Sequence, residues 1–148
     1  MEVHKEGYTI TTDKSKIDTN YVHRFLSTTY WAEGIPLQVV EQSINGSLCF
    51  VVLYGEKQIG FARVITDEAT FAYLADVFIG EDFRHKGLAK WLVQTILNYP
   101  TLKGLRRFML ATKDAHALYA QAGFTSLPIP ERWMQLHFPD VYKNKSGT

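Results

Sequence analysis

Cysteine is nearly absent from the chain: Cys49 is the single cysteine among 148 residues, so no internal disulfide can form. Proteins without disulfides suit reducing compartments, and we predict a cytoplasmic protein. Cys49 lies within the apolar run "LCFVVLY", which predicts a small buried side chain rather than a reactive thiol. The first residues, "MEVHKEGYTI", lack the apolar region of a signal peptide.

An excess of either charge is also lacking, because 16 Lys and Arg face 15 Asp and Glu, for a net charge of +1. Domains that bind nucleic acid are usually strongly basic, so we predict no nucleic-acid partner. No apolar run approaches the roughly 20 residues of a membrane span, which predicts no membrane partner. The five histidines are scattered without HExxH or Cys/His spacing, so we predict no metal site.

No linker, repeat or low-complexity segment divides the chain, and its length suits one domain with a full core. We therefore predict a single domain over residues 1–148, with 142–148 as a frayed tail. Apolar periodicity predicts an α/β (α+β) fold with a mixed sheet, in the order βααβββαβαββ. Helices are expected after Asp18, Pro36, Gly87 and Thr112. The expected strands are 8–12, 48–54, 58–65, 70–79, 106–112, 124–127 and 133–138.

The stretch "DFRHKGLAKWLVQ" (82–94) joins an apolar strand to the clearest helical pattern of the chain. The helix start leaves backbone N–H groups without helical partners, and with the helix dipole these groups favour an anion. Gly87 lets the backbone approach a bulky phosphate or adopt positive φ, and Ala89 keeps the first turn slim. From this stretch alone the alternative stays open: Gly87 only relieves a tight turn, and the three preceding cations are solvated.

The pattern R-x-x-G-x-A at Arg84, Gly87 and Ala89 resembles the acetyl-CoA-binding motif of the GNAT superfamily of N-acetyltransferases. "DAHALYAQAGF" (114–124) looks like the second motif of that family, and the order of elements matches its fold. "YWAEGIP" and "PERWM" resemble segments of small, stand-alone bacterial members. Two departures are visible: Ala89 replaces a commoner glycine, and Lys113 and Asp114 stand near the usual asparagine position.

The resemblance implies acetyl-CoA as co-substrate and no metal. It implies that the strand before the first motif splays from its neighbour and holds the pantetheine arm through the backbone of Val77, Phe78 and Ile79. It implies that loop amides hold the diphosphate, here those of Arg84, His85, Lys86, Gly87, Leu88 and Ala89.

The resemblance also places Tyr119 near the thioester sulfur as general acid. Attack of an amine on a thioester forms a tetrahedral intermediate and expels a thiolate. A phenol with a pKa of about 10 can protonate a thiolate whose conjugate acid has a pKa of about 8.5, a step slightly uphill. The alternative is that Tyr119 only packs beside Leu118.

The attacking amine must lose a proton, since an alkylamine with a pKa of about 10.4 is neutral in about one molecule in 2,500 at pH 7. Asp76 is the one acidic residue in the apolar run "FAYLADVFI", and it is our candidate base. The partners that a buried carboxylate needs would equally make it a structural anchor, so both roles stay open. Glu33 and His116 are weaker candidates.

In this family the acceptor site is lined by the segment between the first two helices and by the last hairpin. That implies Tyr30, Trp31, Glu33 and Arg132, where aromatic faces and a carboxylate suit an ammonium group. Arg132 would pair with a substrate carboxylate, pointing to an amino acid or related small amine. The competing hypothesis is a non-catalytic acyl-CoA-binding or sensing module. A homodimer through the C-terminal strands stays open, because no specific residue supports it.

Overall fold

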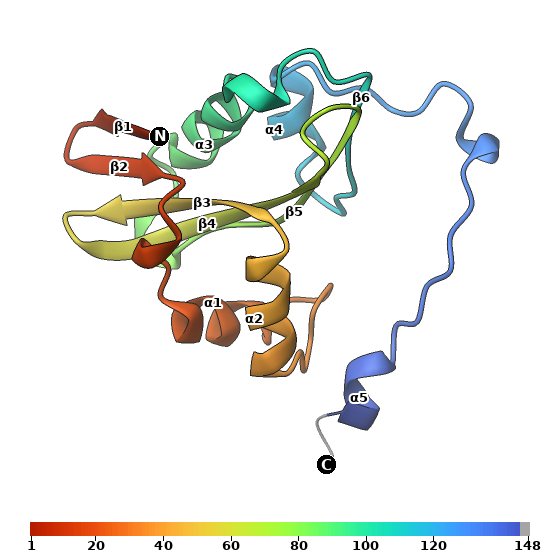
Figure 1. Ribbon diagram of the computed structural model, residues 1–148, viewed down its shortest axis with the longest axis horizontal. Coiled ribbons are helices and arrows are strands. Elements are labelled where there is room, and N and C mark those ends of the chain that lie inside the picture. The colour runs from red at the N-terminus through yellow and green to blue at the C-terminus, as the bar shows by residue number, and fades with distance from the viewer. Residues whose placement is uncertain (146–148) are drawn as a thin grey trace.

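A six-stranded sheet in the order β1-β2-β3-β4-β5-β6 forms the centre of the protein (Figure 1). The structure, a computed structural model, describes residues 1–145. Neighbouring strands are antiparallel from β1 to β5, and β5 and β6 are parallel. The strands are β1 (Glu2–Lys5), β2 (Tyr8–Thr11), β3 (Leu48–Tyr54), β4 (Lys57–Thr66), β5 (Phe71–Ile79) and β6 (Arg107–Leu110).

Helices cover both faces of the sheet, with α1 and α2 on one face and α3 and α4 on the other (Figure 1). Each layer has its own buried apolar cluster, built around Val22 and Val40 on one side and Leu92 and Ile96 on the other. Within residues 1–145 no helix is both long and apolar enough to cross a membrane. The helices are α1 (Thr19–Leu26), α2 (Leu37–Asn45), α3 (Leu88–Leu97), α4 (His116–Gln121) and α5 (Val141–Lys145).

Three of the four helix starts follow their predicted signals. The fourth does not, because α4 begins at His116 after Ala115, and the expected cap Thr112 accepts a hydrogen bond from the Ala115 N–H at 3.0 Å outside the helix. Asp18 is the N-cap of α1, and its Oδ1 accepts a hydrogen bond from the Tyr21 N–H at 3.0 Å. Pro36 directly precedes α2, and Gly87 directly precedes α3 with a φ of 77°. Asp18 satisfies a donor at the start of its helix and Pro36 has no N–H, whereas the donors at the start of α3 stay free.

Strand β1 is absent from the prediction because its residues "EVHK" are mostly polar and too short to show alternation. It forms because Glu6 and Gly7 both adopt positive φ, at 52° and 87°. Two such residues make the tight turn whose twist matches a hairpin, and Lys5 therefore pairs with Tyr8.

The prediction of two final strands at 124–127 and 133–138 is wrong. Neither segment is a strand, and only a short 3-10 helix, Pro130–Arg132, interrupts this part of the chain. Pro128 and Pro130 lack the N–H that a strand ladder requires, which separates the segments from the sheet. The chain instead continues as an extended arm, residues 128–140, which lies apart from the sheet and its helices (Figure 1).

We expected residues 142–148 to form a frayed tail, but the described residues of this segment are helical. Helix α5 includes residues 142–145, and Tyr142 packs against the apolar cluster of α1 and α2. Residues 146–148 lie outside the described part of the chain.

Candidate active site

The parallel strands β5 and β6 separate along their length. They pair only from Phe71 to Leu74 on β5, although β5 continues to Ile79. One extra residue of β5 forms a bulge against β4 between Ala75 and Phe78, and Asp76 there has a φ of 54°. The backbone of Val77, Phe78 and Ile79 therefore has no strand partner on the β6 side within the described sheet.

A cavity of about 700 Å³ occupies this opening. A volume of this size suits a small ligand. Its walls come from β5, from the segment between α1 and α2, from the loop after β6, and from α4 and α5. The lining includes Tyr30, Trp31, Ala32, Arg63, Tyr73, Asp76, Val77, Thr112, Lys113, Asp114, Tyr119 and Tyr142.

The loop between β5 and α3 presents an array of free backbone donors. In the described part of the chain, the N–H groups of residues 85–90 have no hydrogen-bond acceptor. His85 and Gly87 adopt left-handed backbone conformations, with φ of 64° and 77°. Arg84 fixes this loop to the end of β5, because its Nε donates to the Ile79 carbonyl at 3.1 Å. We call residues 84–90 the amide loop.

The amide loop has room for an anion. A Cβ added to Gly87 would meet no atom within 4 Å, so open space lies beside that backbone. Lys5, Lys86 and Trp91 line an adjoining hollow of about 280 Å³. The loop amides, the start of α3 and these two ammonium groups all favour negative charge, and the residues present therefore fit a diphosphate.

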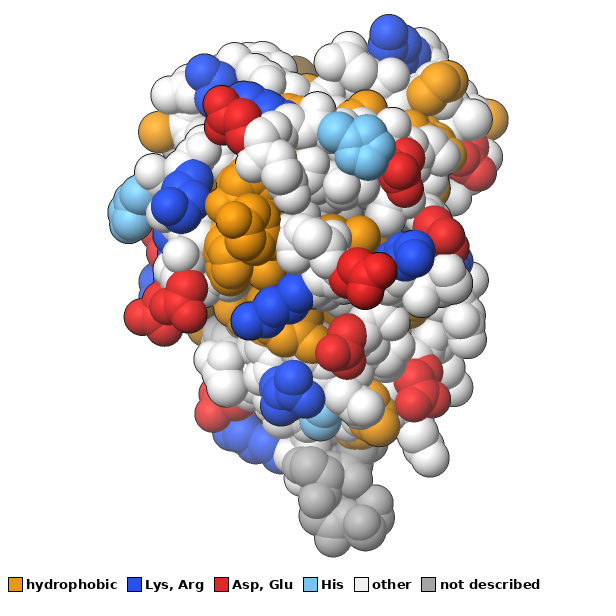
Figure 2. Space-filling model, turned by 90° about the vertical axis from the view of Figure 1, so that its left-hand side faces the viewer, with side chains coloured by type: hydrophobic (Ala, Val, Ile, Leu, Met, Phe, Trp, Pro, Cys, Tyr) orange, Lys and Arg blue, Asp and Glu red, His pale blue; other side chains and the backbone are white. Residues whose placement is uncertain are grey.

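The end of the molecule that carries the β1–β2 and β3–β4 turns shows basic and acidic side chains interspersed (Figure 2). No broad area of one sign covers the face drawn there.

Tyr119 reaches the cavity from the first turns of α4. It is 8% exposed, and its ring meets the edge of the Phe124 ring at a centroid distance of 5.9 Å. Burial, with a smaller contribution from nearby Tyr30, raises the pKa of the Tyr119 phenol above its ordinary value. The hydroxyl therefore keeps its proton at neutral pH.

Asp76 stands at the centre of a polar network on the cavity wall. Its Oδ2 accepts from Arg63 Nε at 2.8 Å, and its Oδ1 accepts from the Trp31 indole Nε1 at 2.9 Å. Arg63 also donates from Nη1 to Ser47 Oγ at 3.0 Å. The Arg63 and Asp76 side chains are 15% and 9% exposed, so each charge relies on the other.

The aromatic side chains expected at the acceptor site do lie at the cavity. Trp31 packs edge-on against Tyr30 with a centroid distance of 5.1 Å. The Tyr30 hydroxyl accepts from the Lys113 backbone N–H at 3.2 Å, and the Lys113 ammonium lies 5.3 Å from the Tyr30 ring centroid. These contacts join the segment after α1 to the loop before α4.

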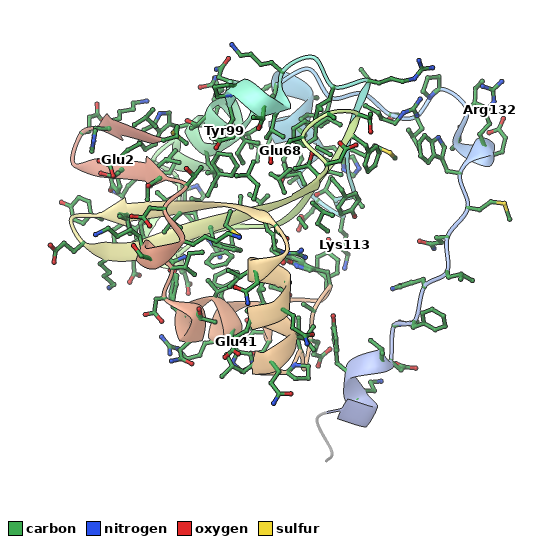
Figure 3. All side chains as sticks on the ribbon, in the orientation of Figure 1. Glu2, Glu41, Glu68, Tyr99, Lys113 and Arg132 are labelled. Carbon is green, nitrogen blue, oxygen red and sulfur yellow. The ribbon has the colours of Figure 1, made fainter. Side chains whose placement is uncertain are left out.

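Three other expected residues do not reach the cavity. Glu33 is exposed and does not line it. His116 lies on α4 but lines an adjoining groove beside β6, which shares Thr112 and Tyr119 with the cavity. Arg132 is on the C-terminal arm, well away from Lys113 (Figure 3).

The sequence interpretation missed Arg63, Tyr73 and Tyr142. Arg63 carried a usable signal, because it is the single charged residue in "QIGFARVI" just as Asp76 is in "FAYLADVFI". Two lone opposite charges on consecutive strands predict a cross-strand ion pair. Tyr142 gave no such signal, since its position depends on where the arm ends.

Residues 18–124 match the model of the Acetyltransferase (GNAT) family. The chain belongs to the GNAT acetyltransferase family. It is 30% identical to a Gibberella zeae protein that is named as an acetyltransferase, with 77% of this chain and 76% of that protein covered. The family resemblance and the mixed α/β fold predicted from the sequence are thereby confirmed.

Solved GNAT structures share this fold. A GNAT-family acetyltransferase from Xanthomonas campestris pv. campestris is 45% identical, covers 94% of this chain and 99% of its own, and has a TM-score of 0.90. Glucosamine-6-phosphate N-acetyltransferase from Arabidopsis thaliana has a TM-score of 0.62 at 17% identity, covering 90% of this chain and 99% of its own. The second likeness concerns the fold alone.

Membership of this family makes the protein an acyltransferase, and the family uses acetyl-CoA as its co-substrate. Residues 1–145 contain no cluster of three or more His, Cys, Asp or Glu side chains suited to a metal ion.

Proposed function

We propose that this protein transfers an acetyl group from acetyl-CoA to the primary amine of a small molecule, by direct attack within a ternary complex. One observation carries the proposal: β5 connects the free amide loop to the cavity that Tyr119 lines. Val77 of β5 lines that cavity, and Ile79 of β5 accepts the hydrogen bond from Arg84 of the amide loop. We also propose that residues 1–148 form one domain.

The amide loop would hold the diphosphate. In the described part of the chain the backbone N–H groups of His85, Lys86, Gly87, Leu88 and Ala89 have no hydrogen-bond acceptor, and open space lies beside Gly87. The backbone edge of Val77, Phe78 and Ile79, which has no strand partner on the β6 side, would hold the amide groups of the pantetheine arm, as an added strand would. Acetyl-CoA, when bound, supplies an acetyl thioester whose sulfur departs as a thiolate.

Tyr119 would protonate that thiolate. Its phenol is buried at the cavity wall and keeps its proton at neutral pH, because burial raises its pKa. A general acid in this position converts the departing thiolate to a neutral thiol, which is a much weaker nucleophile and does not add back to the acetyl carbonyl. Only the hydroxyl of Tyr119 takes part in this step. The ring packs edge-on against Phe124, which positions the hydroxyl.

Asp76 would act as a positioning residue. Both of its oxygens already accept hydrogen bonds, from Arg63 and from Trp31. Through these two contacts the Asp76 carboxylate joins β4 and the segment between α1 and α2. In this role Asp76 holds the Trp31 indole at the acceptor side of the cavity. The alternative role, to be tested, is that Asp76 accepts the proton of the amine.

The acceptor is a small amine in this proposal. Aromatic faces of Tyr30, Trp31 and Tyr73 suit an ammonium or an apolar substituent beside it. The cavity volume of about 700 Å³ is appropriate for a small molecule. Arg132 and Glu33, the two charged residues expected there, lie outside the cavity and do not support an amino-acid substrate.

A panel of small amines and amino acids, assayed with acetyl-CoA by released thiol, tests the proposal. The wild type should acetylate at least one class, and Tyr119→Phe should lower the rate on the order of 100-fold or more. Tyr119→Phe should leave CoA affinity within about twofold, because the hydroxyl makes no contact with the amide loop. A protein that binds CoA but transfers to no amine would be a binding or sensing module, and the proposal would fail.

A further inference from the structure

The C-terminal arm, residues 128–140, is fastened near both ends and free between them. Near its start, the Arg107 guanidinium of β6 lies 4.6 Å from the centroid of the Trp133 ring. Just beyond its end, Tyr142 packs against the apolar cluster of α1 and α2. Every residue from 128 to 141 is exposed, and Figure 3 shows the arm standing apart from the body with its side chains uncovered.

The free part of the arm is apolar, which is costly in water. Met134 is 96% exposed, Leu136 is 88% exposed and Phe138 is 68% exposed. These three residues alternate, so an extended backbone places them on one side of the chain. The run "WMQLHF" contains no Asp, Glu, Lys or Arg, in a protein where these residues make up 21% of the total. Depletion of charge marks the buried centre of protein interfaces.

A surface that matches the arm lies beside β6. Strand β6 is the last strand of the described sheet, so its outer edge has free backbone donors and acceptors. A groove of about 360 Å³ follows this edge. Its apolar lining comes from Phe108, Leu110, Ala120, Phe124 and Leu127.

We infer that the arm is a dimerisation element: Met134, Leu136 and Phe138 of one copy seat in the groove beside β6 of a second copy. The arm does not occupy the groove of its own chain, as the exposure of these three side chains shows. A twofold axis lets each copy give its arm and receive the other, so one kind of contact is made twice.

The available area is sufficient for a specific interface. Large apolar side chains bury on the order of 150 Å² each. Three from each of two copies therefore supply on the order of 1,000 Å² before the groove and the backbone are counted, which reaches the size of specific interfaces. The dimer does not depend on the proposed acetyl transfer, and it can be tested without substrate.

The first test is sedimentation velocity of the full chain at high micromolar concentration. The wild type should sediment at twice the 16.9 kDa of one chain. Leu136→Asp should sediment as a monomer, because a carboxylate cannot enter the apolar groove unpaired. Gln135→Asp is the matched control, with the same added charge on the other side of the arm, and it should remain dimeric. A monomeric wild type, or a dimeric Leu136→Asp, would overturn the inference.

A second test identifies the receiving surface. Leu136→Cys and Thr125→Cys are made in separate chains, which are then mixed and oxidised; Thr125 lines the groove. Disulfide-linked dimers should form in the mixture between one chain of each kind. Links between two Leu136→Cys chains alone, or none in the mixture, would mean that the arm does not seat beside β6. Circular dichroism melting of every variant checks that the fold is kept, as expected for changes at exposed positions.

Discussion

Arg63 and Asp76 form an ion pair across neighbouring strands, with Arg63 Nε 2.8 Å from Asp76 Oδ2. The bulge in β5 makes the contact, because the extra residue there turns Asp76 onto the cavity wall with a φ of 54°. Asp76 also accepts from Trp31, so the pair connects the sheet to the segment between α1 and α2. The ion pair therefore shapes the acceptor side of the cavity as well as stabilising the sheet.

Asp76→Asn should destabilise the protein by about 3 kcal/mol. The Arg63 guanidinium is largely buried, and the substitution removes its counter-charge. Asparagine tolerates the left-handed backbone at this position, so the loss reports the charge rather than strain. Urea unfolding of Asp76→Asn, Arg63→Gln and the double variant measures it. The double variant should be less destabilised than the sum of the two single changes. Additive effects would mean that the pair contributes little.

The same variant separates the two roles of Asp76. If Asp76 positions Trp31, then kcat/KM of Asp76→Asn falls while the midpoint of its rise with pH stays that of the wild type. If Asp76 is the base, that rise should disappear or move. The measurement is kcat/KM from pH 6 to 10 for both proteins with one acceptor amine.

The pH dependence of the wild type should lack a fall on the alkaline side below about pH 10. Burial raises the pKa of Tyr119, which means that its neutral, proton-bearing form persists to higher pH than that of a free phenol. Rates should therefore rise with pH as the amine loses its proton, and remain high. A decline centred below pH 9, absent from Tyr119→Phe, would show that Tyr119 ionises too early for the role proposed.

Gly87→Ala should weaken CoA binding by roughly tenfold or more, because the new methyl group enters the space beside the donors of the amide loop. Gly104→Ala is a matched control: Gly104 has a φ of 82°, against 77° for Gly87, and neither position has an atom within 4 Å of an added Cβ. Both variants should lose about 1 kcal/mol of stability through backbone strain. Isothermal titration calorimetry should find CoA affinity reduced in Gly87→Ala alone. Equal losses in both variants would contradict the site.

Cys49 should be unreactive in the folded protein. It is 1% exposed, and burial raises the pKa of its thiol to about 11. The nucleophilic thiolate is then scarce at pH 8, where a free cysteine reacts readily. Iodoacetamide should modify the protein slowly without denaturant and rapidly in urea. Fast modification of the native protein would contradict the packing of β3.

The elements that were predicted correctly are determined by residues close to one another in the sequence. Asp18 caps α1 with its own side chain, and Gly87 adopts the backbone conformation that begins α3. The apolar runs of β3, β4 and β5 are long enough to identify buried strands without knowledge of their partners. The amide loop was visible for the same reason, since its chemistry is contained in a few consecutive residues.

The features that were missed depend on residues far apart in the sequence. The alternation of "WMQLHF" predicts a strand, but in the structure this segment pairs with no strand of its own chain. The position of Arg132 follows from that arm, which explains why a residue expected at the acceptor site lies away from it. The pair of Arg63 and Asp76 required the register of β4 and β5, which a bulge shifts by one residue.

The most direct measurement of the central claim is the affinity of the wild type for CoA compared with pantetheine, which lacks the diphosphate and the adenosine 3′-phosphate joined to it, and the effect of Gly87→Ala on that difference. If the N–H groups of residues 85–90 hold the diphosphate, calorimetry should give CoA an affinity on the order of 100-fold higher, and Gly87→Ala should remove most of that difference. Equal affinities for the two ligands, or no heat with saturating CoA, would contradict the account.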